Sequence, residues 1–169
     1  MNYIILFIIF LFIFSLFILF LYLLKIKILK LENKIIYLFK EKTNQIPSIY
    51  EITKDYLNKH EEIFQEILIL KKKDYSENTY YNTLIEKTNT YKLIHNELDF
   101  IFRVCNTNPK IEKDPKFNLI KNNILNKSSE IWDNLVLYKS IVRKYNNLIK
   151  LKNFTIIWLI IPINSIISI

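Results

Sequence analysis

The sequence contains no glycine and no alanine, and its single cysteine is Cys105. Without glycine, the phosphate-binding loops of P-loop and dinucleotide-binding proteins are not expected, because they depend on close approach of the backbone to the phosphates. One cysteine leaves no intrachain disulfide and no cysteine-based zinc site, as expected for a reducing cytoplasm. These absences argue against two large enzyme classes.

Arginine is also scarce, since only Arg103 and Arg143 are present, whereas isoleucine, asparagine, lysine, phenylalanine and tyrosine are abundant. This composition is typical of a genome poor in G and C, so the lysine and aromatic counts carry less functional weight than usual. The net charge of +8 suits an anionic membrane surface and nucleic acid equally well. No arginine cluster or RNA-binding signature is present, so nucleic acid is not expected as a partner.

An uncharged apolar run extends from Ile4 to Leu24 and is followed at once by Lys25, Lys27 and Lys30. As a helix, this run would rise about 31 Å, which matches a bilayer core of about 30 Å. We therefore predict a transmembrane anchor over residues 1–24.

The lysines after the run place the following residues in the cytoplasm by the positive-inside rule, with the N-terminus outside. The sequence before Lys25 offers no small-residue cleavage site, which disfavours a cleaved secretory signal. The predicted localisation is the cell (inner) membrane, with a single pass.

Residues 25–153 are predicted to form one all-α cytoplasmic domain, because the apolar residues follow helical spacing close to a seven-residue repeat, as in bundles and coiled coils. The expected stripes are Ile28, Leu31, Ile35 and Leu38; Ile49, Thr53, Tyr56, His60, Ile63, Ile67 and Leu70; Tyr81, Leu84, Thr88, Tyr91, His95, Leu98, Phe102 and Cys105; and Phe117, Ile120, Ile124, Ile131, Leu135, Tyr138, Val142, Tyr145 and Ile149. Asn and Asp near Pro109 and Pro115 suit helix caps.

Pro47 falls where the first two soluble helices meet, and it is either a first-turn proline or a kink in one longer helix. If the chain reverses there, the anchor helix continues into an up-and-down antiparallel four-helix bundle. The uncharged tail, residues 154–169, is too short to span a membrane comfortably. It either lies against the bilayer or the anchor, or closes the end of the bundle.

Two stretches carry a family resemblance. In the first, Ile46-Pro47 is followed by Tyr56 and His60-Glu61, and this stretch resembles the bacterial LemA family. The second contains Asn108-Pro109, then Phe117 and Ile120, and later Tyr145-Asn146, and it is similar to the same family without a gap.

The resemblance implies a membrane-anchored cytoplasmic helical bundle, in a family with no agreed biochemical activity. It assigns structural rather than catalytic roles to Ile46, Pro47, Tyr56, His60, Glu61, Pro109, Phe117, Tyr145 and Asn146. We expect no catalytic residue, no metal ligand and no cofactor, and hence no enzyme.

The leading hypothesis is a scaffold or protein-interaction module at the cytoplasmic face of the membrane, with protein partners or self-association. One alternative is a metal-dependent bundle enzyme that uses His60 and His95, the only histidines, although neither belongs to a Glu-x-x-His pair. A third hypothesis is lipid or nucleic-acid binding through a lysine-rich face. Cys105 and His95 are ten helical residues, about 15 Å, apart, too far for a thiol and its base.

Overall fold

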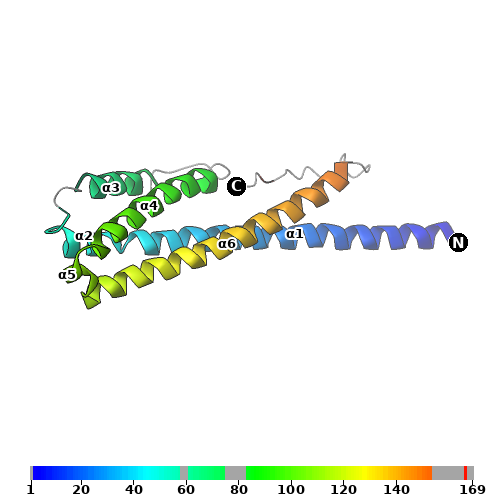
Figure 1. Ribbon diagram of the computed structural model, residues 1–169. Helices are drawn as coiled ribbons and strands as arrows, with labels where there is room; N and C mark the ends of the chain where they lie inside the picture. The colour runs from blue at the N-terminus through cyan, green and yellow to red at the C-terminus, as the bar shows by residue number, and fades with distance from the viewer. Residues whose placement is uncertain (1, 58–60, 75–82, 154–165, 167–169) are drawn as a thin grey trace. The chain divides into compact units, whose positions relative to one another are not determined.

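The computed structural model describes residues 2–57, 61–74, 83–153 and 166, and none of these lies in a β-strand. The helices are α1 (Asn2–Thr43), α2 (Ile46–Thr53), α3 (Glu61–Asp74), α4 (Thr83–Asn106), α5 (Pro109–Glu112) and α6 (Pro115–Asn153) (Figure 1). The predicted all-α class is confirmed for this part of the chain. The up-and-down four-helix bundle stays a prediction.

Two compact units make up the chain. Unit 1 combines Met1–Asn33 with Val136–Ser168, and unit 2 consists of Lys34–Leu135 together with Ile169. The long helices α1 and α6 each contribute to both units. The predicted boundaries at residues 24 and 153 stay predictions.

Pro47 lies in the first turn of α2. This position suits proline, because the first N–H groups of a helix have no partner within the helix. The preceding helix α1 ends at Thr43, and the Gln45 N–H donates to the Lys42 carbonyl at 3.2 Å. Of the two alternatives for Pro47, the structure contains the first-turn proline.

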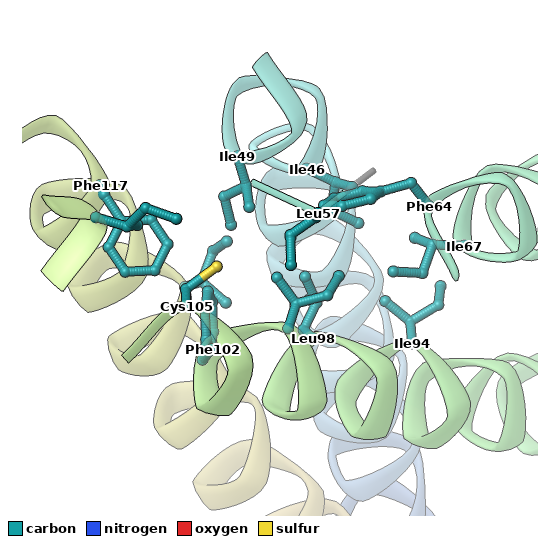
Figure 2. Packing of buried hydrophobic residues seen from close by; sticks show 13 residues of the cluster. Ile46, Ile49, Leu57, Phe64, Ile67, Ile94, Leu98, Phe102, Cys105 and Phe117 are labelled. Carbon is teal, nitrogen blue, oxygen red and sulfur yellow. The ribbon is translucent and has the colours of Figure 1, made fainter. Parts of the chain in front are cut away.

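The core of unit 2 gathers apolar side chains from α2, α3, α4, α5 and α6, and Figure 2 shows how most of them point toward one another. Phe102 of α4 and Phe117 of α6 meet edge to face, with ring centroids 6.2 Å apart. The cluster consists of Ile46, Ile49, Leu57, Phe64, Ile67, Ile94, Leu98, Ile101, Phe102, Cys105, Ile111, Phe117 and Ile124.

The stripe predicted after Pro47 is wrong at Tyr56, which is 48% exposed. The helix α2 ends at Thr53, and the N–H groups of Tyr56 and Leu57 both donate to the Thr53 carbonyl in a turn. Because of this turn, the seven-residue spacing of buried residues before Thr53 does not continue in phase after it. Leu57 and Phe64 therefore enter the core, whereas one continuous helix would have buried Tyr56.

The two predicted caps are present. The Asn108 side chain accepts from the Lys110 N–H at the start of α5. At the start of α6, Asp114 Oδ1 accepts from the N–H groups of Lys116 and Phe117, at 2.7 and 3.1 Å. The stripe predicted for α6 follows the buried face of the helix, except that Ile120 is only partly buried.

Unit 1 contains the apolar first half of α1, whose large side chains between Tyr3 and Phe20 are mostly exposed. Within the described residues, one helix is long and apolar enough to cross a membrane, and it is the helix nearest the N-terminus, where a signal sequence would pass the same test.

Burial in unit 1 begins at Leu21 on α1 and involves the second half of α6. The buried apolar residues are Leu21, Ile28 and Leu31 of α1, and Tyr138, Ile141, Val142, Tyr145 and Ile149 of α6. Burial, and to a lesser extent the negative charge of Glu32, raises the pKa of Tyr138 to about 12, so Tyr138 and Glu32 lie near each other.

Candidate functional site

The most unusual polar group of unit 2 is Lys42, which lies near the end of α1 and is only 2% exposed. It occupies a buried position because it follows Ile35 and Leu38 at helical spacing, seven and four residues later. Its Nζ lies 3.4 Å from Nδ1 of His95 on α4. A lysine amine and an imidazole, 53 residues apart in the sequence, thus meet at the packed surface of two helices.

Burial lowers the pKa of the Lys42 amine to about 8, because the charged form loses its hydration. Burial also lowers the pKa of His95, and the positive charge of Lys42 lowers it further, while Asp99 acts in the opposite direction. At neutral pH, a protonated Lys42 therefore donates to Nδ1 of a neutral His95.

This arrangement is electrostatically costly, since an ammonium group usually enters a protein interior with a carboxylate partner. Asp99, one turn after His95, pairs instead with Arg103. Lys42 thus carries a buried, weakly compensated positive charge and titrates closer to neutral pH than an ordinary lysine does, whereas its partner His95 is exposed.

The metal-site alternative required His60 beside His95. His60 lies outside the described residues, so this pairing stays a prediction, and His95 contacts Lys42 through Nδ1. Among the residues that are described, no three of His, Cys, Asp or Glu lie close enough together to hold a metal ion.

The other predicted structural positions are distributed over both units. In unit 2, Ile46 and Phe117 lie in the core, and Tyr56 is exposed after α2. Pro47 lies in the first turn of α2, and Pro109 is the first residue of α5. Glu61 is the first residue of α3, and its side chain is outside the described part.

In unit 1, Tyr145 is buried, and Asn146 makes two hydrogen bonds to one residue of the tail. The Asn146 amide nitrogen donates to the Ile166 carbonyl at 2.6 Å, and its Oδ1 accepts from the Ile166 N–H at 2.9 Å. The Asn146 amide therefore hydrogen-bonds to both the N–H and the carbonyl of Ile166, as the backbone of a neighbouring β-strand would. The other residues of the tail, 154–165 and 167–169, lie outside the described residues, so both predicted positions of the tail stay predictions.

Cys105 is fully buried in the core of unit 2. Burial raises the pKa of its thiol to about 11, although nearby Lys121 opposes this effect. Only the thiolate is nucleophilic, and the raised pKa leaves little thiolate at neutral pH. Cys105 therefore packs as a small apolar residue.

Polar contacts between α1 and α6 in unit 2 lie on partly exposed surfaces. Lys34 pairs with Glu130 at 3.2 Å, and Glu41 pairs with Lys127 while also accepting from the Tyr37 hydroxyl. Hydrogen bonds from Lys127 and Tyr37 lower the pKa of Glu41. Both pairs join residues that lie far apart in the sequence, and they fix how the two helices align in this unit.

On α6, Trp132 is 61% exposed, and Leu125, seven residues earlier, is also exposed. Residues seven apart lie on nearly the same face of an α-helix. An exposed indole is unusual because burial of such a large side chain is strongly favourable. Leu125 and Trp132 form what we call the Trp132 patch.

The Lys42–His95 pair was not predicted from the sequence. A signal was present, because Lys42 continues the stripe of Ile35 and Leu38. The stripe predicted for α4 is wrong at His95, whose side chain is exposed, while its neighbour Ile94 is buried. A lysine at a stripe position indicates either a buried amine or an interrupted stripe, and only the structure distinguishes them.

The described residues define an all-helical protein with one long apolar helix at its N-terminus. Comparisons with protein-family models, curated proteins and solved structures found no match for the chain. Membership of the LemA family stays a prediction that rests on the motifs quoted above.

Proposed function

We propose that the protein is a LemA-like, single-pass membrane protein of bacterial type whose helical part is a scaffold or protein-interaction module at the cytoplasmic face. The membrane part of this proposal is supported by α1, which exposes large apolar side chains from Tyr3 to Phe20. Exposed apolar side chains over that length suit lipid rather than water. Lys25, Lys27 and Lys30 directly after the apolar run support the cytoplasmic orientation.

The observation that carries the interaction role is the exposed Trp132 of the Trp132 patch. Tryptophan is enriched among the few residues that contribute most of the binding energy of protein interfaces. The indole combines a large apolar area with an N–H donor and loses little conformational freedom on binding. These properties favour a protein partner at this face of α6, which we take to be a different protein.

Site-specific photo-crosslinking of the full-length chain in its native membranes tests this role. A photo-reactive phenylalanine analogue replaces Trp132 in one variant and the exposed Asn126 of the same helix in a control. We expect a discrete crosslinked band from position 132 and none from position 126, and mass spectrometry of the band identifies the partner.

If the band contained only a second copy of this chain, the Trp132 patch would serve self-assembly and not the binding of a different protein. Equal and diffuse crosslinking from both positions would contradict a specific interaction at the Trp132 patch.

A further inference from the structure

Nearly all of the net positive charge of the protein belongs to unit 1. Its sequence contains eight basic residues and one acidic residue, Glu32, whereas the sequence of unit 2 contains sixteen basic and fifteen acidic residues. A genome poor in G and C favours lysine throughout a chain, but it does not remove carboxylates from one unit. The local lack of acidic residues therefore leaves unit 1 with a net charge of +7, from eight basic residues and one acidic residue.

Seven of the eight basic side chains are described, and all seven are exposed to solvent. They are Lys25, Lys27 and Lys30 on α1, and Lys139, Arg143, Lys144 and Lys150 on α6. None of them forms a salt bridge with another described residue. Their charge is thus not neutralised within the part of unit 1 that the structure describes.

The two groups of basic residues lie at a similar level along α1. In unit 1 the helices run in opposite directions (Figure 1), and Tyr138 of α6 lies near Glu32 of α1. Arg143 and Lys150 follow Tyr138 by five and twelve residues, which is about 8 and 18 Å of helix. Counted back from Glu32, the same distances end at Lys27 and Phe20.

The uncharged apolar run of α1 ends near this level, at Leu24. Among the residues that the structure describes, Leu21 is the first buried apolar one, at 3% exposure, and the first lysine of the sequence is Lys25. Tyr22, between them, is exposed. Tyrosine is enriched where a membrane-spanning helix meets the headgroups. The basic side chains of both helices therefore lie beside the boundary between the apolar and the polar parts of α1.

We propose that these residues, which we call the basic collar, bind the headgroups of anionic phospholipids in the membrane that α1 enters. The inference depends on the membrane anchoring in the proposed function. Phosphate oxygens accept charge-assisted hydrogen bonds from lysine, and the Arg143 guanidinium can hold two of them at once. Each basic residue near an anionic surface strengthens association about fivefold.

The test uses the full-length protein reconstituted into phosphatidylcholine vesicles that contain traces of spin-labelled lipid. Electron paramagnetic resonance compares the fractions of labelled phosphatidylglycerol and labelled phosphatidylcholine immobilised by the protein. We expect a preference of about fivefold for phosphatidylglycerol at low salt, weakening toward high salt because exposed charges are screened.

Two variants isolate the basic collar. The variant Arg143→Gln/Lys144→Gln/Lys150→Gln should lose most of the preference. The control Lys110→Gln/Lys113→Gln/Lys116→Gln removes three exposed charges from unit 2 and should keep it. Circular dichroism verifies that both remain helical. Should the first variant lose helicity, Lys25→Gln/Lys27→Gln/Lys30→Gln on α1 provides the same test.

Equal loss in both triple variants would show that net charge alone selects the lipid, and would overturn the assignment to the basic collar. A wild-type protein with no preference for phosphatidylglycerol would also overturn it, and so would tight binding of a short DNA duplex that the collar variant abolishes without any lipid preference. If instead the wild-type protein were extracted from vesicles by alkaline carbonate, the anchoring itself would fail, and with it the proposed function.

Discussion

Replacing the buried lysine of unit 2, in Lys42→Met, should stabilise the protein at neutral pH. A pKa lowered from 10.5 to about 8 corresponds to about 3 kcal/mol of unfavourable free energy for the protonated amine in the folded state. Methionine fills a similar volume without a charge, but the variant loses the hydrogen bond to His95, worth about 1 kcal/mol. The expected gain in the free energy of unfolding is therefore about 2 kcal/mol at pH 7.

The pH dependence gives a second, independent signature. Between pH 8 and pH 10.5 the unfolded chain binds more protons at Lys42 than the folded chain does, because the folded pKa is the lower one. Stability of the wild-type protein from this group therefore rises with pH across that interval, by at most about 1.4 kcal/mol per pH unit. The variant lacks this contribution, so its advantage over the wild-type protein should shrink by about 3 kcal/mol across the interval.

Urea unfolding of the full-length chain in a nonionic detergent, followed by circular dichroism, measures both effects. The control is Lys40→Met, an exposed lysine on the same helix, which should follow the wild-type protein at every pH. In the Lys42→Met protein the pKa of His95, measured by NMR, should rise but stay below its ordinary value, because burial is the larger cause of its lowering. A variant less stable than the wild-type protein at pH 7, or an advantage that stays constant from pH 8 to pH 10.5, would refute this account.

Three further substitutions test the core and a helix cap of unit 2 and the contact of Asn146 with Ile166 in unit 1. Phe117→Ala should lower the free energy of unfolding by about 3 to 5 kcal/mol, because this ring is fully buried, whereas Leu119→Ala, at an exposed position, should change it by less than about 0.5 kcal/mol. Asp114→Ala should cost about 1 kcal/mol in the same urea experiment, since two N–H groups of α6 lose their acceptor. Asn146→Ala should speed hydrogen exchange at the Ile166 amide, which loses its acceptor, and unchanged exchange would show that the two hydrogen bonds do not persist in solution.

The long helices could be predicted from the sequence because their buried residues repeat over many turns. In α6 the spacing from Phe117 to Ile149 matches the buried face of the helix, and Asp114 before Pro115 indicated where the helix begins. A pattern of that length outweighs the weak preferences of single residues.

The turn after α2 could not be predicted in the same way. No glycine or proline marks it, and Lys54 and Asp55 are both compatible with a helix. Tertiary packing decides the outcome, because Leu57 is buried in the core of unit 2 only when the chain turns after Thr53. Likewise, the contact of Lys42 with His95 depends on how two helices align, and spacing along one helix does not contain this information.

The burial of Leu21 makes one face of α1 inaccessible to lipid before the apolar run ends. The exposed apolar side chains continue past Leu21, since Tyr22 is 60% and Leu23 is 54% exposed, so the exposed stretch Ile4–Leu23 rises about 30 Å as a helix. A bilayer core of about 30 Å matches this stretch, so the bilayer does not need to thin around the helix. Because hydrophobic mismatch sorts proteins between membranes, this chain is expected to show no preference for a membrane thinner than that.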